Sequence, residues 1–317
     1  MIIARFAARR LAAMLAILAI VSLLVFSLLA LTPGDPAVLL LGPNRATPES
    51  IAQIRDKYGL DDPFLTQYVH WVGDAVRGDF GRSIRSSEQV TGMIGERLTV
   101  TAWLAGYAFV LTLLVAVPFG LLAGMRKGRL VDRLATATSL LAIAMPSFAV
   151  GFLLIYVFAV RLSWFPAFGR GDGLFDTAHH MTLPALALAV SQIAIVLRQT
   201  RAATMDVVDR DFVTFARARA IPRSRIWRRY VLHNASLPVL TSAGLVLAYS
   251  LTGAVLVENV FALQGLGTLL VTSVAQLDLP LVQALTMFTA LLVLVTNFAV
   301  DLLYFVVDPR LRRAAAT

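Results

Sequence analysis

The sequence predicts an all-α integral membrane protein, because it is apolar overall and its apolar residues come in long runs. Hydrophobic residues make up 58% of the 317 residues, and the mean hydropathy of +0.76 is too high for a soluble domain. A helix needs about 20 apolar residues to cross the bilayer core, whereas a membrane β-barrel shows alternating segments of about 10 residues. Six runs fit transmembrane helices: Ala8–Leu31, Val100–Gly124, Leu134–Val160, Leu183–Met205, Leu237–Val260 and Leu281–Val307.

Charges beside these runs predict their orientation. Arg5, Arg9 and Arg10 precede the first run, so the positive-inside rule places the N-terminus in the cytoplasm. Six spans return the C-terminus to that side. No Lys or Arg occurs between 231 and 307, which agrees with an outer loop between the last two runs. The first run is longer than the apolar part of a signal peptide, so we expect a retained anchor. We therefore expect a multi-pass protein of the inner (plasma) membrane, and the net charge of +9 requires no nucleic-acid partner.

The segment 32–98, between the first two runs, is expected to be a small helical insertion on the extracytoplasmic side. Thr47-Pro48-Glu49 and Asp62-Pro63 are helix-start signals, and a third helix is expected to begin near Ser87-Glu88. The apolar faces of these helices either cover the membrane ends of the bundle or form a surface for an external partner. The sequence leaves both interpretations open.

The second and third runs contain features that affect helix packing. The second contains Pro118 and ends with Gly120 and Gly124, a small-xxx-small face suited to close helix contact. The third contains Pro146 followed by Ser147, and a proline there frees a backbone carbonyl. We favour a packing kink at this proline, and the alternative is a bend that lines a pathway or acts as a hinge.

Polar residues inside the last two runs are the other candidates for a pathway. Glu258, near the outer end of the fifth run, either contacts a substrate or partner or supports the glycine turn that follows; we favour the second role. Asn297, Asp301, Tyr304 and Asp308 share one helical face, which is expected to point into protein rather than lipid. The candidate pathway or gating residues are Pro146, Ser147, Glu258, Asn297 and Asp301.

The most basic part of the chain is Asp211–Pro238, between the fourth and fifth runs. It has no lysine, and Asp211 is its one acid; its arginines are Arg217, Arg219, Arg223, Arg225, Arg228 and Arg229. The positive-inside rule places it in the cytoplasm. The arginines either fix the topology alone or form a docking surface, with a short Ala-rich segment before Pro222.

The chain carries no recognisable enzyme motif. It lacks cysteine, and no G-x-x-x-x-G-K-[ST], H-E-x-x-H or G-x-S-x-G sequence occurs. The pair His179-His180 has no third ligand nearby in sequence, so no metal site is expected. We expect a non-catalytic subunit without a cofactor of its own. If it drives transport with ATP, the ATPase must be a separate subunit that docks in the cytoplasm.

The basic segment resembles the EAA loop of ABC importer membrane subunits, in the version found in dipeptide and oligopeptide permeases. That version has an acid, an aromatic residue, A-R-A-K-G and later R-N-A-x-x-P. The chain matches it with Asp211, Phe212, Ala216-Arg217-Ala218-Arg219-Ala220 and His233-Asn234-Ala235-Ser236-Leu237-Pro238. Ala220 stands in place of the family glycine, and alanine disfavours a left-handed turn, so the match at this position requires Ala220 to be helical. Further similar motifs are Leu31-Thr32-Pro33-Gly34-Asp35-Pro36, Trp164-Phe165-Pro166-Ala167-Phe168-Gly169, Glu258–Gly267 and Asp308-Pro309-Arg310-Leu311-Arg312.

The resemblance implies one membrane subunit of a type I ABC importer for peptides. It implies a second, similar permease subunit, two cytoplasmic subunits that bind ATP and Mg, and an extracytoplasmic substrate-binding protein. The expected organisation is a helix at 1–31, the insertion at 32–98, a permease core at 99–308 with a coupling loop at 206–236, and a tail at 309–317. The ATPase-coupling residues would be Asp211, Phe212, Thr214, Phe215, Ala216, Arg217, Ala218, Arg219, Ala220, Ile221, Pro222 and Arg223.

Other functions stay open at this point. Related permeases carry nickel, glutathione or sugars. An ion-coupled secondary transporter is a different class, and it commonly has ionisable residues at mid-membrane, where Asp301 is the main candidate. A membrane scaffold without transport activity is the third class.

Overall fold

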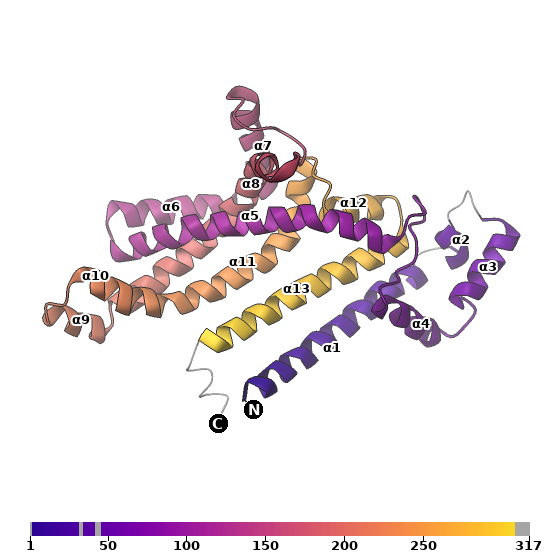
Figure 1. Ribbon diagram of the computed structural model, residues 1–317, viewed down its shortest axis with the longest axis horizontal. Coiled ribbons are helices and arrows are strands. Elements are labelled where there is room, and N and C mark those ends of the chain that lie inside the picture. The colour runs from indigo at the N-terminus through magenta and orange to yellow at the C-terminus, as the bar shows by residue number, and fades with distance from the viewer. Residues whose placement is uncertain (1, 32–33, 42–45, 308–317) are drawn as a thin grey trace. The chain divides into compact units, whose positions relative to one another are not determined.

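The computed structural model is built of helices (Figure 1). It describes residues 2–31, 34–41 and 46–307, and within these ranges there is no β-strand, only an isolated bridge between Arg82 and Gln89. The all-α prediction is thus confirmed. The helices are α1 (Ile2–Leu31), α2 (Pro36–Leu41), α3 (Pro48–Tyr58), α4 (Phe64–Val76), α5 (Val90–Met125), α6 (Leu130–Ala144), α7 (Ser147–Leu154), the π-helix η1 (Ile155–Arg161), α8 (Gly173–Val208), α9 (Asp211–Ala218), α10 (Arg223–Ile226), the π-helix η2 (Trp227–Val231), α11 (Leu232–Val260), α12 (Leu266–Ala275) and α13 (Leu279–Val307).

The long helices account for most of the predicted spans. Four of the described helices, in α1, α5, α8 and α13, are long and apolar enough to cross a membrane, and the number rises to six if each of two bent helix pairs counts as one span. The fifth predicted span falls in α11. The third is divided between α6 and the α7–η1 pair.

Pro146 does more than kink the third predicted span. α6 ends at Ala144, α7 begins at Ser147, and the two directions differ by 101°. Met145 is extended, with φ −86° and ψ 122°, because the proline ring disfavours the helical conformation in the preceding residue. The interpretation as a packing kink was therefore wrong: the helix breaks here and starts again in a new direction.

The chain divides into two compact units. Among the described residues, one comprises 2–7, 102–263 and 296–307, and the other comprises 8–101 and 264–295. In the first unit α8 packs against α6, α7 and α11.

The close contact between α5 and α8 depends on the glycines that the sequence singled out. A Cβ at Gly120 would lie 2.6 Å from the Thr200 Cβ, and one at Gly124 would lie 2.6 Å from the Thr204 Cβ. Only glycine leaves room for this approach, so the predicted small-xxx-small contact is confirmed.

A buried polar group joins three helices of the first unit. Gln192 of α8 donates a hydrogen bond to the Ser250 hydroxyl of α11 at 3.0 Å, and its side-chain oxygen accepts one from Thr112 of α5 at 3.3 Å. All three side chains are buried. Because a polar group without a partner is costly away from water, this set favours one mutual placement of the three helices.

The second unit has its own apolar core, formed where the start of α5 meets α12 and α13. Its buried residues are Val90, Ile94, Leu266, Leu269, Leu281, Ala284 and Leu285. Asp278 secures the loop before α5, since it accepts hydrogen bonds from the Ser83 hydroxyl at 2.5 Å and the Ile84 N–H at 3.2 Å.

The predicted starts of α3 and α4 are confirmed. Thr47 caps α3 in a capping box with Ser50, and Pro63 precedes α4. The helix expected near Ser87-Glu88 is instead the first part of α5, continuous with the second predicted span. Val90 and Ile94, at the start of this helix, are buried.

An ion pair ties α3 to the residues before α2. Arg55 donates to Asp35 at 2.9 Å and to Asp61 at 2.7 Å. The hydrogen bond from Arg55 and one from the Ala37 N–H hold the pKa of Asp35 below its usual value. The motif Pro33-Gly34-Asp35-Pro36 lies only partly within the described residues.

Candidate functional site: the arginine hairpin

The basic segment folds into a small helical hairpin at the far end of α8 and α11 (Figure 1). We call residues 210–231, which contain α9, α10 and η2, the arginine hairpin. Val213, Ala216, Ile226 and Val231 form its buried core together with Val207 at the end of α8, and Ile221, Trp227 and Tyr230 pack around them. The hairpin is thus a folded element rather than a loose loop.

Local sequence explains the bounds of α9. Arg210 is extended and interrupts the helix after α8, and Asp211 opens α9, where a negative charge favours the positive end of the helix dipole. Arg217 lies in the last turn, where a positive charge is favourable. The Phe212 ring stacks on Tyr230 of η2, with ring centroids 6.3 Å apart.

The end of α9 corrects the expectation for Ala220. Ala220 is left-handed, with φ +52°, rather than helical. The Ile221 N–H donates to the Ala216 carbonyl at 3.2 Å and the Ala220 N–H donates to the Arg217 carbonyl at 3.0 Å, which is the Schellman pattern of a helix C-terminus. These two bonds and the packing of Ile221 in the hairpin core hold alanine in a conformation that glycine adopts more easily.

The outer surface of the hairpin is basic and aromatic. Arg210, at its start, pairs with Asp206 of α8 at 2.9 Å. Within the described residues, the other six exposed arginines of the hairpin take part in no ion pair: Arg217, Arg219, Arg223, Arg225, Arg228 and Arg229. Phe215 is 68% exposed and Phe212 is 41% exposed. Arginine and aromatic residues are enriched at the centres of protein interfaces, so the composition suits protein docking.

The other predicted coupling residues divide between surface and core. Thr214, Ala218, Ala220, Pro222 and Arg223 are exposed, and Pro222 caps the start of α10. Ala216 is buried and Ile221 is half-buried, so these two residues shape the hairpin from inside.

Two ion pairs attach the base of the hairpin to the turn between α5 and α6. Lys127 donates to Asp209 at 2.9 Å, directly before the hairpin. Arg201 of α8 makes a two-pronged contact with buried Asp132 of α6, with one N–O distance of 3.1 Å, and Asp132 also accepts from the Gly128 N–H at 2.8 Å. These pairs connect the end of α8, next to the hairpin, to the α5–α6 turn and to α6.

The predicted pathway residues lie on several helices. Ser147 begins α7 directly after Pro146, and α7 packs against the end of α11, where Gly151 faces Val260 and Phe261. Glu258 is fully buried in this part of α11, and its backbone carbonyl accepts from the Leu263 N–H at 2.8 Å.

Asn297 and Asp301 lie on α13, away from Glu258. Val300, next to Asp301, packs on Gly244 of α11. Gly244 is about 20 Å along the helix from Glu258, so the structure does not bring Glu258 and Asp301 into one site. Asn297 is exposed and Asp301 half-buried. Tyr304 and Asp308 are outside the residues whose side chains the structure describes.

Two polar contacts that position the site were not among the expectations from the sequence. One is the Asp132–Arg201 pair, and the other joins Thr112, Gln192 and Ser250. Polar residues inside apolar runs were the available signal, since such residues are expensive in a membrane and need partners.

Comparison with known proteins identifies the family. The family described as "Binding-protein-dependent transport system inner membrane component" matches residues 116–313, and its N-terminal counterpart matches residues 3–105. The chain belongs to this family. It is therefore a multi-pass component of the inner membrane and a permease subunit of the ABC importer class.

Curated relatives cover nearly the full chain. A probable peptide ABC transporter permease of Sinorhizobium fredii is 36% identical over 96% of the chain and 98% of its own length. The oligopeptide transport system permease protein AppB of Bacillus subtilis is 38% identical over 92% of the chain and 94% of its own length. The glutathione transport system permease protein GsiC of Escherichia coli K12 is 37% identical over 96% of the chain and 97% of its own length.

Proposed function

We propose that this permease forms half of the translocation pathway of an ATP-driven importer of peptides, delivered by an extracytoplasmic binding protein. Its partners would be a second, similar permease subunit and two ATP-binding subunits. The proposal includes six spans with both termini in the cytoplasm and the segment 32–98 outside. The observation that carries it is the arginine hairpin, a folded basic element fixed to the ends of two long helices.

The hairpin is proposed as the docking site of the ATPase subunits. Nucleotide can shift a permease between two states only if the docked ATPase contacts those states differently. A hairpin with its own core moves as one body, so it can pass a displacement to α8 and α11. Exposed Phe215 and the unpaired arginines would supply the contacts.

Peptides are the proposed substrate class because of the relatives. The names of two of them specify peptides or oligopeptides, and a third specifies glutathione, which is itself a tripeptide. The alternatives within the family, nickel and sugars, have no support among these three.

The decisive experiment compares Phe215→Ala with Phe175→Ala in the full transporter. Phe175 is 88% exposed near the opposite end of α8, so it is a matched aromatic control. Truncating an interface anchor costs about 2 kcal/mol, or about 30-fold in affinity. We expect Phe215→Ala to lose co-purifying ATPase subunits and peptide uptake, and Phe175→Ala to keep both.

Two outcomes would contradict the proposal. Equal ATPase recovery with the two variants would show that the hairpin is not the docking site. Purification of the wild-type chain from mild detergent without any ATP-hydrolysing subunit would contradict the importer itself. Uptake of labelled nickel or a sugar, with no uptake of labelled oligopeptides or glutathione, would overturn the substrate class alone.

A further inference from the structure

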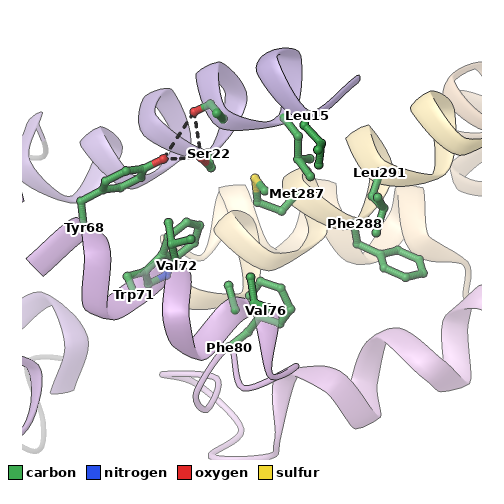
Figure 2. A pocket seen from close by; sticks show the side chains of 13 residues that line it. Leu15, Ser22, Tyr68, Trp71, Val72, Val76, Phe80, Met287, Phe288 and Leu291 are labelled. Atoms are coloured by element: carbon green, nitrogen blue, oxygen red, sulfur yellow. Dashed lines mark hydrogen bonds between the residues drawn. The ribbon is translucent and has the colours of Figure 1, made fainter. Parts of the chain in front are cut away.

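An apolar groove of about 420 Å³ lies between α1, α4 and α13, all within the second unit (Figure 2). Its lining residues are Leu15, Leu18, Ala19, Ser22, Tyr68, Trp71, Val72, Ala75, Val76, Phe80, Met287, Phe288 and Leu291. The side-chain hydroxyls in the lining belong to Ser22 and Tyr68, which are 2.7 Å apart, and Ser22 also donates to the Ala19 carbonyl at 2.8 Å. Because these hydroxyls bond to each other and to the backbone, the groove suits hydrocarbon rather than water or a polar ligand.

The groove extends from the middle of α1 toward its C-terminal end, where α4 packs. Its α1 residues, Leu15 to Ser22, cover about 10 Å of a helix that crosses the membrane between Arg5 and Leu28. Only 17% of the residues in the most apolar stretch of α1 are buried. Most of the apolar surface of α1 around the groove is thus uncovered by the described residues of this chain.

α4 forms the wall of the groove and has a second, uncovered apolar strip. Its aromatic side packs around Phe26 of α1, where the rings of Phe64, Tyr68 and Trp71 lie 5.3 to 5.6 Å from the Phe26 ring. The adjacent strip contains Leu65, Val69 and Val76, which are 70%, 64% and 82% exposed.

The polar residues of α4 lie on the opposite side of the helix. They are Thr66, Gln67, His70 and Asp74. A helix with this division buries its apolar side in protein or lipid and keeps its polar side toward water. α4 contacts the C-terminal half of α1, so its exposed strip faces the leaflet around that half.

We propose that the groove binds one acyl chain of a phospholipid from this leaflet. An empty groove of this size would leave its lining without contacts on one side, and an acyl chain restores those dispersion contacts. The chain enters beside the exposed strip of α4 and lies along α1 between Ser22 and Leu15. The proposal concerns a lipid site, so it does not depend on the transported substrate or on the ATPase.

Trp71 provides a direct reporter for this site. The chain has four tryptophans, and the substitutions Trp103→Phe, Trp164→Phe and Trp227→Phe leave Trp71 as its only tryptophan. A further Trp71→Phe substitution gives the emission of the co-purifying subunits, which is subtracted. The full chain, with its co-purifying subunits, is reconstituted into phosphatidylcholine vesicles with or without brominated acyl chains. Bromine quenches tryptophan only at close contact, so we expect strong quenching of Trp71.

A blocking variant separates the groove from the surrounding lipid. Ala19→Leu adds a side chain inside the groove, and Ala13→Leu makes the same change at an exposed position of α1 outside it. We expect at least a twofold loss of Trp71 quenching in the first variant and no change in the second. Ala75→Leu fills the groove from α4, and we expect it to lower Trp71 quenching as Ala19→Leu does. Agreement between the two variants would show that the lower quenching does not come from a folding defect in α1.

Three results would overturn the proposal. Equal quenching in Ala19→Leu and Ala13→Leu would place the bromine contacts outside the groove. Absence of quenching in the unblocked protein would show that no acyl chain reaches Trp71. Quenching of the isolated chain that disappears in the complete assembly would assign the groove to a second membrane subunit instead of a lipid.

Discussion

Ala220 occupies a backbone conformation that costs an L-residue about 1–2 kcal/mol. The position cannot relax, because the Schellman bonds of α9 and the packing of Ile221 fix the chain as it turns toward Pro222. The family resemblance has glycine at this point, and the left-handed φ of +52° explains why glycine suits it. The departure from the family pattern therefore preserves the turn at a cost in stability.

Ala220→Gly should stabilise the protein, by about 1 kcal/mol, because glycine adopts the left-handed conformation without strain. Ala218→Gly is the control, and we expect it to change the stability in the opposite direction. Ala218 is the last residue of α9 and is exposed, so glycine there should weaken the helix by up to about 1 kcal/mol. The measurement is the midpoint of thermal unfolding in detergent.

A lower unfolding temperature for Ala220→Gly than for the parent chain would contradict the left-handed assignment. Equal shifts in both glycine variants would show that the two positions have the same helical conformation. Neither result would bear on docking of the ATPase, since both substitutions leave the arginines and Phe215 in place.

At the scale of elements, α8 is the helix on which the first unit is built. It packs on α6, α7 and α11 and approaches α5 through glycine. It also leads directly into the arginine hairpin. A helix with so many partners moves only together with them, which suits an element that connects the hairpin to the membrane core.

Gly120→Ala should separate α5 from α8. The added Cβ would lie 2.6 Å from the Thr200 Cβ and 2.9 Å from the Leu197 carbonyl oxygen, and neither atom can rotate away. We expect a loss of about 1–3 kcal/mol in stability. Gly106→Ala is the matched control in the same helix, where a Cβ would meet no other atom within 4 Å.

The control should be neutral or slightly stabilising, because alanine favours helix more than glycine does. Unfolding temperatures in detergent report both effects. If Gly120→Ala were as stable as Gly106→Ala, the α5–α8 contact would be looser than the structure has it.

The sequence predicts elements better than contacts, and particular residues show why. Long apolar runs require helices, so α1, α5, α8 and α13 follow from length alone. Pro146 signals a disturbance, but a proline alone does not determine whether a helix kinks or breaks by 101°. Arg201 and Asp132 are 69 residues apart, and no local pattern identifies them as partners.

The arginine hairpin was predictable in composition but not in conformation. Its arginines and its place between two apolar runs indicated a docking surface. Its small core and the left-handed turn at Ala220 were not apparent, because each depends on residues of α8, α9 and η2 that meet only after folding. Alanine occupies a left-handed turn here because tertiary contacts outweigh the cost of about 1–2 kcal/mol for an L-residue.

At the scale of the whole molecule, the question is what energy source moves the substrate. A secondary transporter takes its energy from an ion that binds a membrane-embedded ionisable group. Asp301 of α13 is the main acid of this kind in the sequence, and Glu258 is about 20 Å away along the helices. An importer driven by docked ATPases needs no titratable group in the membrane. Substitution of Asp301 therefore distinguishes ATP-driven uptake from ion-coupled uptake.

Asp301→Asn removes the charge and keeps the shape of the side chain. In proteoliposomes that contain the complete transporter, we expect this variant to take up peptide only when ATP is present on the hairpin side. Collapse of the proton or sodium gradient with an ionophore should leave uptake unchanged in the variant and in the wild type. An ionophore that abolishes wild-type uptake, together with an Asp301→Asn variant that loses gradient-driven flux, would instead establish ion coupling. Uptake that persists without nucleotide would contradict a role for the arginine hairpin in energising transport, even if the ATPase subunits co-purify.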